Sequence, residues 1–122
     1  MDGSEFAHDK RIEADGAVTV FHPRGVLSGR PECYAWLESI RRDVGEGRKR
    51  LVLNLQDVSR IDSTGVGLIA AIHVSVMNIG GVVCLTGLSD RTRRLLETTF
   101  LLRVVPSAAD EAEAIRRAAA DA

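Results

Sequence analysis

The sequence predicts an α/β fold, a single domain with a mostly parallel central sheet and about four helices. Apolar runs of strand length alternate with helical patterns, and this order requires crossovers between parallel strands. An Asp15-Gly16 pair between two strand-like segments predicts an N-terminal hairpin, which adds an antiparallel strand. The length of 122 residues suits one such domain.

The composition excludes several classes of protein. The 16 Lys+Arg nearly balance the 17 Asp+Glu, so the chain lacks the basic character of a nucleic-acid-binding protein. No apolar run reaches the ~18 residues of a membrane span, and the N-terminus has no signal-peptide pattern. Cys33 and Cys84 lie in apolar patterns, which indicates buried thiols. We expect a cytoplasmic protein without membrane insertion or direct contact with nucleic acid.

The N-terminal region divides into two parts. Residues 1–6, Met-Asp-Gly-Ser-Glu-Phe, are typical of a cloning remnant, so we assign residues 1–9 to this remnant and a disordered N-terminus. Residues 10–122 form the domain. Its hairpin strands are predicted at residues 10–14 and 17–22, with a two-residue turn between them. Pro23-Arg24-Gly25 interrupts the second strand, as a bulge or at an edge, before residues 26–27 resume it.

A helix is predicted from about Pro31, because proline suits the first helical turn. Its apolar residues recur at helical spacing, and Gly45 and Gly47 end it. The residues that share its apolar face are Cys33, Trp36, Leu37, Ile40 and Val44.

The centre of the chain runs from a predicted strand at residues 51–55 through a polar turn into a helix over residues 65–78. That helix is apolar around nearly its whole circumference, with His73, Ser75 and Asn78 as the larger polar groups. Such a helix is either central or covered by another element. One side of it is therefore a candidate partner surface.

Two further strand–helix pairs complete the predicted fold. Residues 82–86 form a buried strand, and Ser89 caps a helix over residues 90–98. Residues 102–105 form a last short strand. Ser107-Ala-Ala-Asp110 resembles a capping box for a final helix that runs to the end of the chain.

The turn Asp62-Ser63-Thr64-Gly65 is where we expect the function to lie. A strand that enters a helix through such a turn places hydroxyl groups beside backbone N–H groups that lack intrahelical partners. The helix dipole favours negative charge there, so the turn suits a phosphate. Ser63 is therefore the leading functional candidate, and an ordinary N-cap role would also account for it.

Enzymatic and ligand-binding alternatives fit these residues less well. Asp62 as an acyl-phosphate acceptor would need an acidic pair to hold a metal, and no such pair is found. Ser63 as a hydrolase nucleophile lacks the Gly-x-Ser-x-Gly elbow because Ile61 replaces its first glycine, and His73 fits a packed residue better than a base. Gly65-Val66-Gly67 lacks the third glycine of a dinucleotide loop. The histidines and cysteines lack metal-ligand spacing, so we expect no cofactor, no metal and no enzyme.

The segment Asn54-Leu-Gln-Asp-Val-Ser-Arg-Ile-Asp-Ser-Thr-Gly-Val-Gly67 closely resembles the signature of STAS domains, the family of bacterial anti-sigma factor antagonists. The resemblance covers nearly the whole chain after residue 10. It includes the opening hairpin, the Gly80-Gly81-Val-Val spacing and a later Arg-Leu-Leu segment. It implies a STAS-type fold and a role in a protein–protein switch.

In antagonists of this kind, a serine directly after the motif aspartate is phosphorylated by a partner that is both anti-sigma factor and ATP-dependent serine kinase. The unphosphorylated form binds that kinase and frees the sigma factor, and a phosphatase resets the cycle. The resemblance makes Ser63 the acceptor, with Thr64 as the second candidate, and leaves a homo-oligomer open. The partner-binding residues that it implies are Ser28, Asp62, Ser63, Thr64, Gly65, Val66, Gly67 and Leu68.

One position departs from the family pattern. The family commonly places an acid after the Gly-x-Leu of the hairpin strand, where it helps to engage the kinase, but Gly25-Val-Leu is followed by Ser28 here. This departure sustains an alternative. The chain would then be a non-switching STAS scaffold subunit of a signalling assembly, or the cytoplasmic accessory of a membrane transporter.

Overall fold

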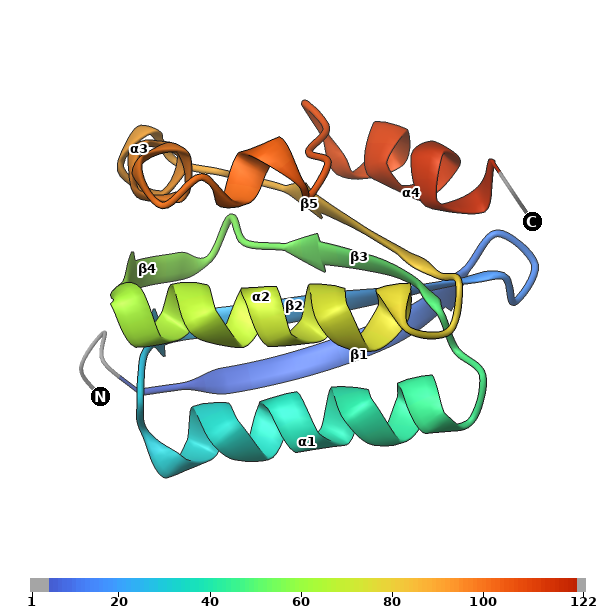
Figure 1. Ribbon diagram of the computed structural model, residues 1–122, viewed down its shortest axis with the longest axis horizontal. Helices are drawn as coiled ribbons and strands as arrows, with labels where there is room; N and C mark the ends of the chain where they lie inside the picture. The colour runs from blue at the N-terminus through green and yellow to red at the C-terminus, as the bar shows by residue number, and fades with distance from the viewer. Residues whose placement is uncertain (1–4, 121–122) are drawn as a thin grey trace.

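Helices cover both faces of a central sheet in the computed structural model, which describes residues 5–120 (Figure 1). The strands within these residues are β1 (Ala7–Glu13), β2 (Val18–Leu27), β3 (Arg50–Asn54), β4 (Val58–Ile61) and β5 (Val82–Thr86). The helices are α1 (Pro31–Gly45), α2 (Ser63–Met77), α3 (Asp90–Thr98) and α4 (Glu111–Ala119), with a short 3-10 helix, η1 (Leu101–Arg103), after α3. The predicted α/β fold is confirmed.

The long strand β2 organises the sheet. β1 pairs with it antiparallel, while β3 and β4 both pair with it parallel. β3 lies against residues 19–21 and β4 against residues 25–27, so the two short strands follow one another along the same side of β2. β5 extends the sheet beyond β3, which gives the order β1-β2-β3-β5. This topology places the end of β4, where α2 begins, next to the end of β2.

Alternating side chains of the strands form two cores. Leu51 and Leu53 of β3 belong to a larger core with α1 and α2, whereas Val52 belongs to a smaller core with α4. Trp36 of α1 is fully buried and packs edge-on against Phe6, with the ring centroids 5.9 Å apart. Each fully buried side chain of this kind stabilises the fold by roughly 1.5–3 kcal/mol. A shift of one residue would turn all of these side chains to the other face of the sheet, so the alternation fixes which face of each strand meets which helix.

The hairpin differs from its prediction. β1 begins at Ala7, before the expected boundary at residue 10, and residues 1–4 of the expected cloning remnant lie outside the described residues. The two-residue turn is wrong: Glu13 pairs with Val18, which leaves a four-residue loop. Ala14, Asp15 and Gly16 all have positive φ, of 54°, 55° and 93°, so the Asp-Gly signal marks the turn but not its length.

The predicted interruption at Pro23-Arg24-Gly25, as a bulge or at an edge, is found as an irregularity of register and not as a break in β2. The register of β2 against β4 shifts between Gly25 and Val26, while Pro23 stays within the strand. Gly25 has φ +95°, and an added Cβ there would overlap the backbone carbonyl of Glu5. Glycine is needed at this position both for its conformation and for the close approach of the N-terminal segment.

Two elements were not predicted correctly. β4 occupies what we predicted as a polar turn, because pairing with β2 orders a four-residue strand that has too little apolar pattern to be recognised alone. The predicted strand at residues 102–105 is wrong, since the chain forms η1 there. Leu101 and Val105 are buried while Val104 is 60% exposed, a spacing of four that fits a helical turn better than a strand.

The cap of the last helix is also corrected. Asp110, not Ser107, is the N-cap of α4, and its carboxylate accepts from the Glu113 N–H at 2.8 Å. Glu113 reciprocates by accepting from the Ala109 N–H at 3.2 Å. Ser107 instead forms an isolated parallel bridge with Leu85 of β5. Ser89 caps α3 as predicted, accepting from the Thr92 N–H at 3.1 Å.

Candidate functional site

The start of α2 is held tightly against the end of β2. The backbone N–H of Asp62 donates to the Leu27 carbonyl at 3.3 Å. One turn into the helix, an added Cβ on Gly65 would overlap that same carbonyl oxygen and lie 2.8 Å from the Ile61 side chain. Gly65 is therefore required by close packing of helix on strand, which explains its place in the motif without a nucleotide.

Asp62 is the N-cap of α2. Its Oδ1 accepts from the Gly65 N–H at 2.9 Å, and its carbonyl accepts from the Val66 N–H at 3.0 Å. The interpretation of Ser63 as the N-cap is thus wrong. Because Asp62 caps the helix, the side chain of Ser63 is not needed as a cap.

Ser63 is the first residue of α2 and is exposed. Its hydroxyl makes no hydrogen bond with any other residue in 5–120. An exposed primary hydroxyl at a helix N-terminus can accept a phosphoryl group, because the first-turn N–H groups and the dipole favour the added negative charge.

The other residues that the sequence singled out divide by exposure. Thr64 is half-buried and packs against Gly29, where an added Cβ would lie 3.4 Å from the threonine methyl group. Asp62, Ser63 and Gly67 are exposed, and Ser28 is half-buried at the end of β2. Gly65, Val66 and Leu68 are buried. The buried three position the helix, and the remaining five, including Thr64, are those that a partner can reach.

A shallow hollow of about 190 Å³ lies beside Asp62. The residues that line it are Val26, Ser28, Arg30, Arg60, Ile61 and Asp62. Neither arginine was singled out as functional from the sequence. Arg60 belongs to the unpredicted strand β4 and Arg30 is the N-cap of α1, and the pairing of β4 with the end of β2 brings these two elements together.

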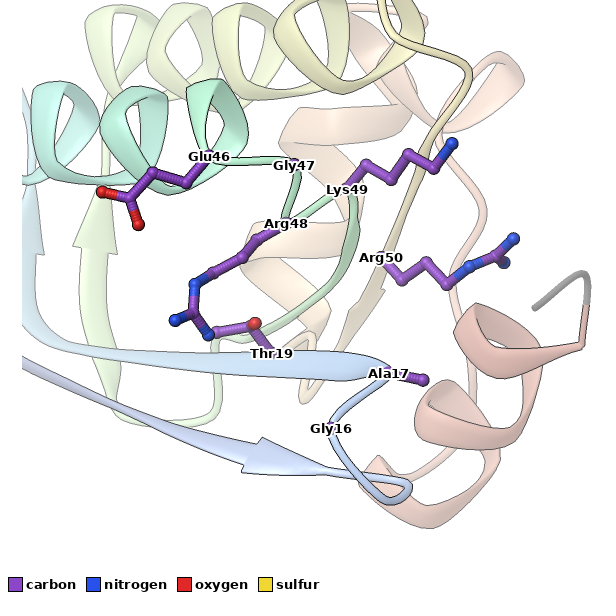
Figure 2. Close-up of a pocket in the computed structure, with 8 residues that line it drawn as sticks. All are labelled: Gly16, Ala17, Thr19, Glu46, Gly47, Arg48, Lys49 and Arg50. Atoms are coloured by element: carbon purple, nitrogen blue, oxygen red, sulfur yellow. The ribbon is translucent and has the colours of Figure 1, made fainter.

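A larger hollow, of about 430 Å³, lies at the opposite end of the sheet (Figure 2). The hairpin loop and the loop between α1 and β3 border it. Arg48 reaches towards Thr19 there, whereas Lys49 and Arg50 point away, and the Arg50 guanidinium donates to the Ala118 carbonyl at 3.0 Å (Figure 2). The three consecutive bases therefore do not converge on one ligand position.

A catalytic role for Ser63 finds no support in the geometry. His73 lies ten residues further along α2, which at 1.5 Å per residue is about 15 Å and out of hydrogen-bond range. Within residues 5–120, no group of three His, Cys, Asp or Glu side chains could hold a metal ion. Cys33 and Cys84 are buried, and burial raises the pKa of both thiols, which keeps them unreactive.

No helix among the described residues is long and apolar enough to cross a bilayer.

Comparison with known proteins identifies the family. The STAS domain model matches residues 10–114. Over 62 residues the chain is 37% identical to the TM1081 homologue of Thermotoga neapolitana, whose name assigns it provisionally to the anti-sigma factor antagonists. That match covers 51% of this chain and 55% of the relative, so it spans about half the length of either protein.

Solved structures of two proteins share the fold. TM1081 of Thermotoga maritima, assigned in the same provisional way, has a TM-score of 0.81 at 23% identity over 90% of this chain and 92% of its own. The anti-sigma factor antagonist SpoIIAA in its unphosphorylated form has a TM-score of 0.70 at 22% identity over 91% of this chain and 96% of its own. SpoIIAA of Bacillus has also been solved in its phosphorylated form. At these identities the likeness concerns the fold.

Proposed function

The chain belongs to the STAS domain family, and we propose that it is a cytoplasmic anti-sigma factor antagonist that is switched by phosphorylation of Ser63. One observation carries the proposal: an exposed, unbonded serine hydroxyl opens α2, directly after a capping aspartate. The unphosphorylated protein binds an anti-sigma factor that is also a serine kinase, and so releases the sigma factor for transcription. A phosphatase restores that form.

In the switching step, Ser63 is the acceptor and the partner is the enzyme. The Ser63 Oγ forms a bond to the γ-phosphorus of ATP as the bond to ADP breaks, and the hydroxyl proton passes to a base on the kinase. This chain contributes a nucleophile in a fixed position, because Asp62 and Gly65 pin the start of α2 to β2. The antagonists of this family are themselves non-enzymatic regulators.

Phosphorylation would act on the interface and leave the fold intact. A phosphoserine carries about −1.5 to −2 charge, which beside Asp62 repels an acidic or apolar partner surface. Within the chain the same charge lies at the N-terminus of α2, where the dipole favours it. The partner surface that we propose consists of Ser28, Asp62, Ser63, Thr64, Gly65, Val66, Gly67 and Leu68, with the buried members supporting the exposed ones.

The first experiment is phosphopeptide mass spectrometry on the protein isolated from its native cells, with and without stress. We expect phosphate on Ser63 whose occupancy changes with condition. A well-covered peptide that stays unmodified in every condition would contradict the switch. Thr64→Ala is the matched control, since it should leave the modification in place and thereby exclude the second hydroxyl as acceptor.

A binding experiment then tests the consequence. Ser63→Asp should lower affinity for the cognate kinase by at least about tenfold, or 1.4 kcal/mol, while its circular dichroism stays that of the wild type. Ser63→Ala should bind but resist release by ATP. Equal affinity of Ser63→Asp and wild type would show that charge at this residue does not control the complex.

A second candidate function is a non-switching STAS subunit of a signalling assembly or a transporter. Two observations favour it: Ser28 stands where the family commonly has an acid, and Val74 and Met77 of α2 are each 55% exposed. Such a subunit would co-purify in fixed stoichiometry with a permease, an ATPase subunit or another STAS protein, whether or not Ser63 is phosphorylated. A monomer that binds only a kinase would exclude this candidate.

A further inference from the structure

The hollow beside Asp62 has an excess of positive charge. Two arginines, Arg30 and Arg60, line it together with one acidic residue, Asp62, and Arg30 has an interaction partner within the chain. One oxygen of the Asp62 carboxylate is already engaged, because Oδ1 accepts from the Gly65 N–H at 2.9 Å. Arg60 is exposed and lines the same hollow as Asp62. Even so, it makes no hydrogen bond or ion pair with any residue in 5–120.

The hollow is within reach of Ser63. Ser63 follows Asp62 directly, and Arg60 precedes Ser63 by three residues, a distance of at most about 11 Å along fully extended backbone. Arg30 belongs to a different element, as the N-cap of α1, and lines the same hollow. Two arginines from different elements therefore line a hollow that also includes Asp62, the residue directly before Ser63.

We propose that Arg60 and Arg30 form a clasp that holds the phosphoryl group of phosphorylated Ser63 in the hollow beside Asp62. This inference rests on the proposed function, since it concerns the phosphorylated form of the same serine. Guanidinium groups suit the role because their planar N–H donors match phosphate oxygens in charge-assisted, bidentate hydrogen bonds. The unengaged Arg60 is available for such bonds without first breaking an ion pair.

The clasp changes how phosphorylation reaches the partner. Two cations next to a phosphate of about −2 charge offset the repulsion between that phosphate and Asp62, so the modified turn keeps its shape. The clasped phosphate also fills the hollow lined by Ser28. The occupied hollow then excludes the partner in addition to the charge of the phosphate. The hollow includes Ser28, the position where the family commonly has an acid.

The test uses the full chain with phosphoserine placed at position 63 by genetic incorporation, so it does not depend on whether native cells phosphorylate the residue. The readout is the titration of the phosphate followed by 31P NMR between pH 4 and pH 8, since phosphoserine loses its second proton near pH 6. A clasp favours the dianion, so the wild-type midpoint should lie about half a pH unit below that of Arg60→Gln. The midpoint of Arg30→Gln should likewise lie above that of the wild type.

The matched control is Arg48→Gln, which removes the same charge at the opposite end of the sheet and should leave the midpoint unchanged. Arg60→Lys should give an intermediate midpoint, because it retains the charge without the planar donors. Equal midpoints in wild type, Arg60→Gln and Arg30→Gln would overturn the clasp even if Ser63 is phosphorylated in cells. Conversely, an unmodified Ser63 in cells would contradict the phosphorylation switch, but the difference in midpoint between wild type and the arginine variants would still support the clasp.

Discussion

The two ends of the sheet carry hollows that differ in how they are built. The hollow beside Asp62 measures about 190 Å³ and lies where α2 packs directly on β2. The hollow at the other end measures about 430 Å³ and lies between two loops. An added Cβ on Gly65 would strike the backbone of Leu27, whereas one on Gly16 or Gly47 would meet nothing within 4 Å.

This contrast shows that the larger hollow is not the more closely packed end of this fold. At the smaller hollow, hydrogen bonds hold Asp62, the residue before Ser63, to the end of β2 and to the first turn of α2. At the larger hollow, the loop glycines have room around them and the basic side chains diverge (Figure 2). We expect an alanine at Gly65 of the first end to cost stability through packing and one at Gly47 of the second end through backbone conformation alone.

The largest expected effect is that of Gly65→Ala. The added methyl group would overlap the Leu27 carbonyl, and because the struck atom is backbone the helix itself must move. We expect a loss of about 2–3 kcal/mol in the free energy of unfolding, at the upper end of overpacking costs. Urea denaturation followed by circular dichroism measures it.

Gly67→Ala is the control within the same helix. Gly67 is exposed and an added Cβ there meets nothing within 4 Å, so alanine should stabilise the protein by roughly 0.5–1 kcal/mol through its better helix propensity. If the two variants changed stability by the same amount, the close packing of α2 on β2 would not be what requires Gly65.

The next effect tests the loop end. Gly47 has φ +92°, which costs a residue with a side chain about 1–2 kcal/mol, so Gly47→Ala should destabilise the protein by that amount without any clash. Gly45→Ala is its partner control, since Gly45 ends α1 without a positive φ and has equal room. We expect Gly45→Ala to be neutral or slightly stabilising in the same denaturation assay, and a cost equal to that of Gly47→Ala would rule out the conformational explanation.

A smaller effect is expected from the cap of α2. Asp62→Ala removes the acceptor for the Gly65 N–H and should cost about 1 kcal/mol, with faster amide exchange at Gly65. Asp62→Asn keeps an acceptor oxygen and should cost no more than a few tenths of a kcal/mol. Equal losses for the two variants would mean that the charge of Asp62, and not its hydrogen bond, stabilises the helix.

Much of the fold could be predicted because its local signals agree with its packing. The face of α1 that packs on the sheet carries Trp36 and Ile40 at helical spacing, and Ser89 caps α3 as its position suggests. β4 and η1 escaped prediction for a shared reason: each is four residues or shorter, and tertiary contacts stabilise it more than its own pattern. Residue propensity cannot supply that information.

The candidate site was predicted only in part. The motif placed Ser63 at the start of a helix, and the structure places it there, but the motif did not distinguish the cap from the candidate acceptor. Arg60 lies two residues before Asp62 in the sequence, but only the fold brings Arg30 to the same hollow. A charged residue in a polar turn carries no sign of which hollow it will line, so the clasp could not have been proposed from the sequence.

The smallest expected effects are those of single arginines in the unphosphorylated protein. Arg60→Gln and Arg48→Gln each remove an exposed charge, one at either end, and should change the free energy of unfolding by no more than about 0.5 kcal/mol. If so, any difference between the two ends that appears after phosphoserine is installed comes from the phosphate, because the arginines do not distinguish the ends by stability. A loss above 1 kcal/mol for Arg60→Gln alone, measured by urea denaturation, would instead make Arg60 a structural residue. The two ends would then differ in what an arginine contributes to stability as well as in packing.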